Sequence, residues 1–270
     1  MPDDNRVHIP NHRPDAGSSA SPAKDGDLTP VAERLAHPAR NRWILHDTSL
    51  LPEAAEELFQ PHRLQQQGSI TETRIGRRAT HFLNYDGLDL VLRHYWRGGW
   101  VARLSEDRYL WTGRTRTRPV REWNLTRILY EQGLPVPRPV AARVMRHGLV
   151  YSGDLVTATV SDATPLDEWI QQQEDTPTLW HEVGATLARF HQFGAWHADL
   201  NVRNILVQPS GKVWLIDWDR GRLSVQRGLQ GNLERLRRSL EKWPEIRERG
   251  RTGWSELLSG YRSARGGDGD

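Results

Sequence analysis

The sequence predicts an α+β fold of two lobes: a small N-lobe built on an antiparallel sheet with one helix, and a mainly helical, abbreviated C-lobe. Its 270 residues are enough for two small domains with a sizeable core. In the first half of the chain, short apolar runs with strand-like alternation are separated by turn residues. In the second half, apolar residues recur at helical spacing and are interrupted by one short hairpin. We place the N-lobe at 31–156 and the C-lobe at 157–262.

The two ends of the chain differ from the rest in composition. Residues 1–30 contain five prolines among Asp, Ser, Gly and Asn, so we expect a disordered leader there. Residues 263–270 end in Gly-Gly-Asp-Gly-Asp and are expected to form a loose tail. No apolar stretch resembles a signal-peptide core, and none approaches the roughly 18 residues needed to span a bilayer. The sequence therefore predicts neither a signal peptide nor a transmembrane helix.

The strands of the N-lobe are predicted from alternation and from the turns between them. A turn around Gly76 separates the first two runs, and an Asp-Gly turn precedes the third. Alternation in the third run places three leucines on one face and Arg93 on the other. The five predicted strands cover 70–75, 81–85, 88–95, 140–145 and 149–156.

One helix is predicted in the N-lobe, between Pro119 and Gly133. Proline is favoured at the first position of a helix and glycine just past its end. Glu122 lies three residues before Leu125 and seven before Leu129, so it shares their buried stripe. We therefore expect Glu122 to lie on the buried side of this helix.

The C-lobe is predicted to be helical around one hairpin. Its second helix starts after Thr176 and Pro177 and carries apolar residues at spacings of four, four and three. A Pro-Ser-Gly turn joins the two strands of the hairpin. The predicted helices cover 166–173, 177–190, 229–243 and 254–261, and the hairpin strands cover 205–207 and 213–216.

The composition excludes several kinds of chemistry. Three of the 37 basic residues are lysines, at positions 24, 212 and 242, and the other 34 are arginines. No lysine stands in a Gly-Lys-Ser/Thr loop, which excludes a Walker-type NTPase, and the scarcity of lysine argues against a Schiff-base enzyme. The absence of cysteine excludes disulfides, thiolate nucleophiles and cysteine metal sites. A cation that grips phosphate between residues 25 and 211 must therefore be arginine.

Three oxygen-bearing side chains are expected to converge at one end of the hairpin. Pairing across the predicted turn places Asn204 opposite Ile216, so Asn204 and Asp217 emerge at the same end. Asp199 precedes Asn204 by five residues on the loop that leads to this end. Carboxylate and amide oxygens suit Mg²⁺ or Mn²⁺, held by Asn204 and Asp217. Asp199 is then left to orient a hydroxyl group and accept its proton.

These motifs resemble the protein-kinase-like superfamily. His-x-Asp-x4-Asn at 197–204 is similar to its catalytic loop, and Asp-Trp-Asp at 217–219 stands where the superfamily has Asp-Phe-Gly. The resemblance implies a bilobal protein-kinase-like fold that uses ATP. It also implies that Asp199 is the catalytic base and that Asn204 and Asp217 hold Mg²⁺.

The same resemblance implies three nucleotide-binding residues in the N-lobe. Gly76 would belong to the loop over the phosphates, although this loop is reduced to one glycine. Arg93 stands where the superfamily usually has lysine, and Glu122 stands where a helix glutamate pairs with that lysine. The alternative for Arg93 and Glu122 is a surface ion pair worth under about 1 kcal/mol.

A closer resemblance is to the lipopolysaccharide kinase family and its 3-deoxy-D-manno-octulosonic acid (Kdo) kinases. It implies transfer of the ATP γ-phosphate to the 4-hydroxyl of a Kdo sugar on Kdo-lipid IVA. It also implies a peripheral protein on the cytoplasmic side of the inner membrane. An arginine at position 93 and an aspartate at position 219 fit this family. The motifs that carry the resemblance lie at 91–99, 121–123, 133–137, 197–201 and 216–221.

The partners expected are a lipid-linked Kdo acceptor and an anionic membrane surface; no nucleic acid is expected and no protein partner is inferred. Arginine favours contacts to phosphate and carboxylate. Tryptophan and arginine concentrate at 96–118, which indicates either a solvated basic loop or an interfacial membrane patch. Two other functions stay open: an atypical protein kinase or small-metabolite phosphotransferase, and a non-catalytic arginine-rich binding module. Only 53 residues follow Asp217, too few for the substrate-binding helices of a protein kinase.

Overall fold

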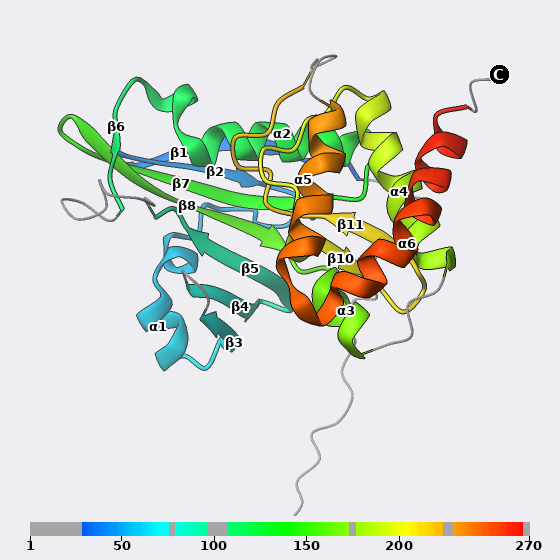
Figure 1. Ribbon diagram of the computed structural model, residues 1–270. Helices are drawn as coiled ribbons and strands as arrows, with labels where there is room; N and C mark the ends of the chain where they lie inside the picture. The colour runs from blue at the N-terminus through cyan, green and yellow to red at the C-terminus, as the bar shows by residue number, and fades with distance from the viewer. Residues whose placement is uncertain (1–28, 76–78, 97–106, 173–176, 224–228, 267–270) are drawn as a thin grey trace, which may run out of the picture.

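Two lobes of different construction lie side by side in the computed structural model, which describes residues 29–75, 79–96, 107–172, 177–223 and 229–266 (Figure 1). The N-lobe is a large antiparallel sheet with helices, and the C-lobe is mainly helical with a second, small sheet. The predicted α+β, two-lobed fold class is confirmed. The leader lies almost wholly outside the described residues, and so does the second half of the tail, 267–270.

The N-lobe sheet has eight antiparallel strands. Its order is β1-β2-β7-β8-β5-β4-β3, and β6 pairs with β8. All five predicted strands are present, with ends shifted by at most two residues. The strands are β1 (Glu33–Ala39), β2 (Arg42–Asp47), β3 (Ile70–Ile75), β4 (Ala79–Tyr85), β5 (Leu88–His94), β6 (Tyr109–Leu110), β7 (Pro139–His147) and β8 (Val150–Ala158).

Helices cover both faces of this sheet. The short α1 (Pro61–Gln66) and the 3-10 turn η1 (Glu56–Phe59) pack on one face, where Leu90 and Leu92 of β5 are buried. Helix α2 (Arg118–Glu131), preceded by η3 (Arg114–Arg116), packs on the other face with Tyr95 and Trp123. Alternation along β5 therefore directs Arg93 toward α2, as the sequence predicts. The expectation of one N-lobe helix is incomplete, because the six residues of α1 are too few to show helical periodicity.

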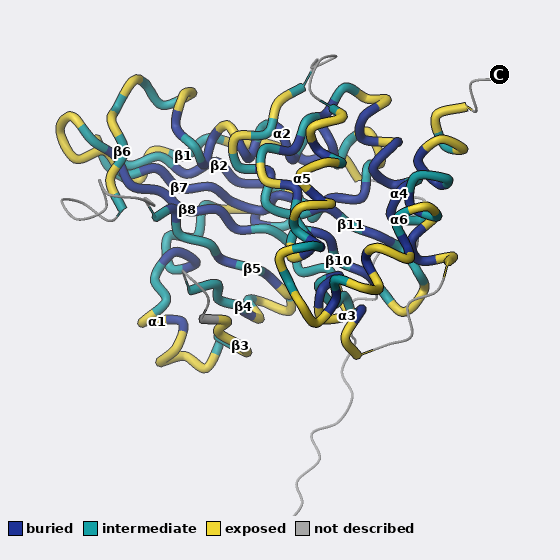
Figure 2. The backbone as a smooth tube through the Cα atoms, viewed as in Figure 1, coloured by how far each residue is buried: buried dark blue, intermediate teal, exposed yellow. Residues whose placement is uncertain are grey.

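Among the described residues, the C-lobe has four α-helices around a three-stranded sheet of order β11-β10-β9. Figure 2 shows its buried segments facing inward, with the exposed sides of α5 and α6 outward. Its elements are β9 (Thr164–Pro165), α3 (Leu166–Gln172), α4 (Pro177–Gln192), η4 (Val202–Asn204), β10 (Ile205–Val207), β11 (Val213–Leu215), α5 (Leu229–Lys242) and α6 (Pro244–Ala264).

Glycines let α4 and α6 pack with their backbones close together. A Cβ atom on Gly184 would overlap the carbonyl oxygen of Leu257, and one on Gly260 would overlap that of His181. Helix α6 begins ten residues before the predicted start. Gly250 and Gly253 lower the helical propensity of that first part, so the sequence does not indicate a helix there. No helix in the described part of the chain is both long and apolar enough to cross a membrane.

Candidate active site

The hairpin of the C-lobe brings the predicted catalytic and metal-binding residues together. Ile205 pairs with Leu215, and the amide of Ile216 donates to the carbonyl oxygen of Asn204 at 3.0 Å, in the register that the sequence predicts. The Asn204 side-chain amide donates to the backbone carbonyl of Asp199 at 2.9 Å. Asp199, Asn204 and Asp217 therefore lie at one end of the hairpin.

His197 fixes the loop that carries Asp199. It is buried, and its Nδ1 accepts the Asp199 amide hydrogen at 3.2 Å while its Nε2 lies 2.9 Å from the Ile216 carbonyl oxygen. Burial lowers the pKa of His197, so the ring is neutral and Nε2–H donates to Ile216. The ring also packs edge-on against Trp218. His197 thus braces both chain segments of the site.

Asp217 is held in an unusual backbone conformation. Its φ angle is +63°, in the left-handed region that costs a non-glycine residue about 1–2 kcal/mol. Such strain persists where the surroundings impose it, and it is frequent at functional sites. Burial raises the pKa of Asp217, but the charge and hydrogen bond of Arg93 outweigh this and hold the pKa below its usual value. The carboxyl group is therefore ionised.

Arg93 joins the N-lobe to Asp217. Its Nη1 donates to Asp217 Oδ1 at 2.6 Å, and its Nη2 donates to Oε1 of Glu122. The Tyr95 hydroxyl donates to the other oxygen of the same Glu122 carboxylate. The Glu122 side chain is 2% exposed, so this is not the surface pair that the sequence left open as an alternative. One guanidinium group links β5, α2 and the hairpin end.

A second ion pair, which sequence reasoning missed, ties α2 to the same segment. Arg118 Nε donates to Asp219 Oδ1 at 2.8 Å, and its guanidinium carbon lies 4.8 Å from the ring centre of Tyr109 and 5.4 Å from that of Tyr95. Asp219 occupies the position where the kinase motif has glycine. That departure from the motif was the available signal that this side chain has a partner.

Helix α5 holds the loop from the other side, through residues that the sequence did not single out. Asn232 accepts the His197 amide hydrogen at 3.1 Å and donates to the His197 carbonyl oxygen at 2.6 Å. Ser239 accepts the Val202 amide hydrogen at 3.2 Å. Arg235 Nη1 lies 3.5 Å from Asp199 Oδ1. These contacts join positions 35 or more residues apart, so no local pattern reports them.

The donor set fits Mg²⁺ when nucleotide phosphates complete it. Across the described residues, no group of three or more His, Asp or Glu side chains is placed to hold a metal ion. Asn204 and Asp217 supply an amide oxygen and a carboxylate. Mg²⁺ is usually bound by one or two protein carboxylates together with phosphate oxygens and water. Two protein ligands are therefore sufficient for a site of this kind.

Some predicted residues lie outside this geometry. Gly76 is not among the described residues, and residues 97–106 of the Trp/Arg-rich stretch at 96–118 are likewise outside them. Within the described part, Trp111 stacks on Trp43 with ring centres 5.3 Å apart and lies under the Arg146 guanidinium. Trp111 therefore packs within the N-lobe and is not free to insert into a membrane surface.

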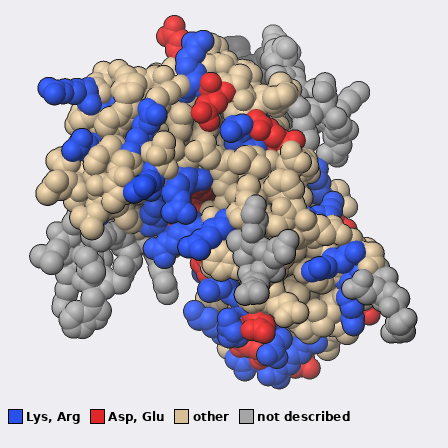
Figure 3. Space-filling model, turned by 90° about the horizontal axis from the view of Figure 1, so that it is seen from above, with Lys and Arg blue, Asp and Glu red and all other residues tan. Residues whose placement is uncertain are grey.

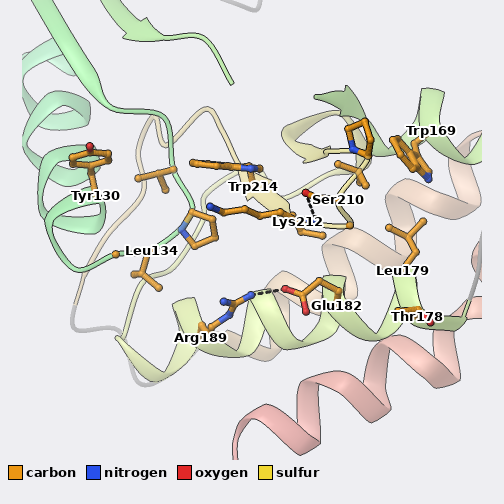
Figure 4. A pocket seen from close by; sticks show the side chains of 17 residues that line it. Tyr130, Leu134, Trp169, Thr178, Leu179, Glu182, Arg189, Ser210, Lys212 and Trp214 are labelled. Atoms are coloured by element: carbon orange, nitrogen blue, oxygen red, sulfur yellow. Dashed lines mark hydrogen bonds and ion pairs between the residues drawn. The ribbon is translucent and has the colours of Figure 1, made fainter. Parts of the chain in front are cut away.

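A large and a small cavity border the described part of the C-lobe. One of about 830 Å³ lies between α4, the hairpin turn and the segment after α2, where Trp214, Lys212, Leu134 and the Arg189–Glu182 pair line it (Figure 4). None of Asp199, Asn204 and Asp217 lines this cavity. The other, about 40 Å³, is lined by Arg118, Arg121, Glu122, Asp219 and Arg220 beside the candidate site.

Comparison with known proteins gives one consistent result. Residues 61–261 match the Lipopolysaccharide kinase (Kdo/WaaP) family. The chain is 38% identical over 229 residues to a 3-deoxy-D-manno-octulosonic acid kinase of Photobacterium profundum, covering 82% of this chain and 95% of that protein. It is 37% identical to the kinase of that name from Vibrio cholerae (81% and 94% covered) and 42% identical to one from Stenotrophomonas maltophilia (74% and 80% covered). The matched region spans both lobes and every described residue of the candidate site.

Proposed function

Because the chain belongs to the lipopolysaccharide kinase (Kdo/WaaP) family, we propose that it transfers the γ-phosphate of ATP to the 4-hydroxyl of a Kdo residue on Kdo-lipid IVA. Membership makes it a phosphotransferase that acts on an alcohol group. The observation that carries the proposal is the meeting of Asp199, Asn204 and Asp217 at one hairpin end, with the Arg93–Glu122 pair behind them. Phosphoryl transfer depends almost wholly on positioning and charge neutralisation, which such an arrangement supplies.

Each residue has a defined part in the proposed reaction. The Kdo hydroxyl donates a hydrogen bond to the Asp199 carboxylate, its oxygen attacks the γ-phosphorus, and the bond to the β–γ bridging oxygen breaks, releasing ADP. The hydroxyl proton passes to Asp199. Arg93 donates to the α- and β-phosphates while Glu122 holds it in place. We also assign Gly76 to the loop over the phosphates.

Asn204 and Asp217 would hold Mg²⁺ or Mn²⁺. When bound, the ion neutralises charge on the β- and γ-phosphates. The carboxylate of Asp217 is kept ionised by Arg93, and the Asn204 side chain is oriented by its hydrogen bond to the Asp199 carbonyl. The chain's own contribution is therefore two fixed oxygen ligands next to the proposed base.

The acceptor is tested by supplying ATP, MgCl₂ and Kdo-lipid IVA to the purified protein and following the lipid by mass spectrometry. We expect the lipid to gain one phosphate group, with ADP formed in equal amount. The phosphate position is then read by fragmentation of the product. Addition of EDTA is expected to stop the reaction, because the proposed ligand set is completed by phosphates on a divalent cation.

The same assay separates the rival functions. If phosphate appears on a protein or a small metabolite and on no Kdo acceptor, the protein is a phosphotransferase with a different substrate. Absence of ATP turnover with every acceptor would favour a non-catalytic arginine-rich module. Salt-dependent affinity for nucleic acid would also support the non-catalytic binding module.

We further propose that the protein acts as a peripheral protein at the cytoplasmic face of the inner membrane, where its lipid acceptor would be found. Figure 3 looks down on the side that carries α2 and shows basic side chains gathered around a hollow. Arg121 and Arg220 are exposed and line the small cavity beside Asp219. A basic residue near an anionic bilayer contributes about 1 kcal/mol of attraction.

The membrane proposal predicts salt-sensitive binding to anionic vesicles. In co-sedimentation, the protein is expected to bind vesicles of phosphatidylglycerol and phosphatidylethanolamine, and to be released as salt screens the charges. Replacing Arg121 and Arg220 by glutamine is expected to weaken binding about 10- to 30-fold. Neutral phosphatidylcholine vesicles are the control. Equal binding to both vesicle types would contradict an electrostatic contact.

A further inference from the structure

Arg235 is a cation that α5 places beside the proposed base. Its Nη1 lies 3.5 Å from Asp199 Oδ1, and the two side chains are 44% and 66% exposed. A charge-assisted N–H···O hydrogen bond is normally 2.7–2.9 Å long, so this contact is loose. Exposed ion pairs of this kind are weak. The guanidinium is therefore able to turn toward an anion that binds next to Asp199.

The backbone that carries Arg235 is nevertheless fixed. Asn232 makes two hydrogen bonds to the backbone of His197, and Ser239 makes one to that of Val202. Asn232, Arg235 and Ser239 are spaced three and four residues apart, so they lie on one face of α5, which is the face against the loop. The backbone of Arg235 is thus held in place while its guanidinium group can turn, which suits a residue that binds substrate.

The acceptor offers a matching group. The relatives act, by their names, on 3-deoxy-D-manno-octulosonic acid, and an acid of this kind carries a carboxylate at neutral pH. A sugar whose hydroxyl donates to the exposed Asp199 carboxylate comes close to the Arg235 guanidinium, because the two side chains lie 3.5 Å apart. Arginine binds carboxylates through two parallel N–H···O bonds.

We propose that Arg235 binds the carboxylate of the acceptor sugar and so selects sugar acids over neutral sugars. The inference rests on the proposed function, because it assigns the acceptor side of the same site. In the free protein, Arg235 pairs loosely with Asp199. On binding, the sugar carboxylate takes the guanidinium, and the hydroxyl of the same sugar takes the Asp199 carboxylate. The residue then sets both the choice of acceptor and its orientation.

The test combines a substitution in the protein with a change in the acceptor. Wild type and Arg235→Gln are compared on Kdo-lipid IVA and on its Kdo methyl ester, in which the carboxylate charge is removed. In wild type, we expect esterification to lower kcat/KM about 10- to 100-fold, the range expected for one charge-assisted contact. In Arg235→Gln, both acceptors are expected to react at about the same low rate. The KM for ATP should be unchanged.

Control variants make the outcome decisive. Arg237→Gln alters an exposed arginine two residues along α5, on another face, and is expected to keep the wild-type preference for the acid. Arg235→Lys keeps the charge without the fork and is expected to retain part of the preference. If Arg235→Gln still prefers the acid to the ester as wild type does, the inference is overturned. If wild type phosphorylates neither acceptor, the proposed function falls, and the inference with it.

Discussion

Asp199→Asn is expected to lower kcat about 10²- to 10⁴-fold, the usual contribution of a positioned general base, while the Kd for ATP stays unchanged. The substitution keeps the size of the side chain and removes only its charge. The contacts by which residue 199 holds the loop use its backbone, as the amide donates to His197 and the carbonyl accepts from Asn204. Its carboxylate is 66% exposed, so the fold should not be affected.

The measurement for this variant separates chemistry from binding. Phosphate transfer to the lipid acceptor gives kcat, and titration with a fluorescent ATP analogue gives the Kd. Glu234→Gln, which neutralises an exposed carboxylate on α5 instead of the one on the loop, is the matched control and should keep both constants. Thermal unfolding of the three proteins should coincide within error. Near-normal turnover by Asp199→Asn would remove Asp199 from its proposed role.

The site could be predicted from the sequence where its geometry is local. Asn204 and Asp217 are joined by a short hairpin whose turn and register are readable, and the structure has that register. The stripe that buries Glu122 and the alternation that turns Arg93 toward it are also local patterns, and the two side chains do pair. The ligands of these residues are predicted from the resemblance to kinases and not from the periodicity of the sequence.

The rest depends on contacts between distant positions. Strand β1 is a largely exposed edge strand, so it shows no apolar alternation. Strand β2 ends at a fully buried Asp47, whose charge is satisfied by Arg138 at 2.7 Å, 91 residues later. From the sequence alone, an aspartate at this position indicates a turn, because its buried partner is not visible in the local pattern. Asn232 and the pairing of Asp219 with Arg118 were missed for the same reason, because tertiary packing selects these partners.

Arg93→Lys is expected to lower kcat/KM for ATP about 10- to 100-fold, although it keeps the positive charge. Arg93 uses two different nitrogens, one for Glu122 and one for Asp217, and a single ammonium group cannot reproduce this fork. Losing one hydrogen bond to a charged group costs about 1.5–3 kcal/mol. Arg93→Met should be worse, at about 3–5 kcal/mol, because it leaves the buried Glu122 carboxylate without its counter-ion.

The partner of Arg93 provides the internal check. If the pair acts as one unit, Glu122→Gln combined with Arg93→Met should lose much less than the sum of the two single losses, in both kcat/KM and unfolding free energy. Arg251→Lys is the control, since it changes an arginine in an exposed pair with Glu241 at 2.8 Å, and the losses in kcat/KM and in unfolding free energy should both be small. Additive losses would mean that Arg93 and Glu122 act separately. Wild-type activity in Arg93→Lys would mean that a point charge is enough, and that the two-nitrogen link between α2 and Asp217 is not needed for catalysis.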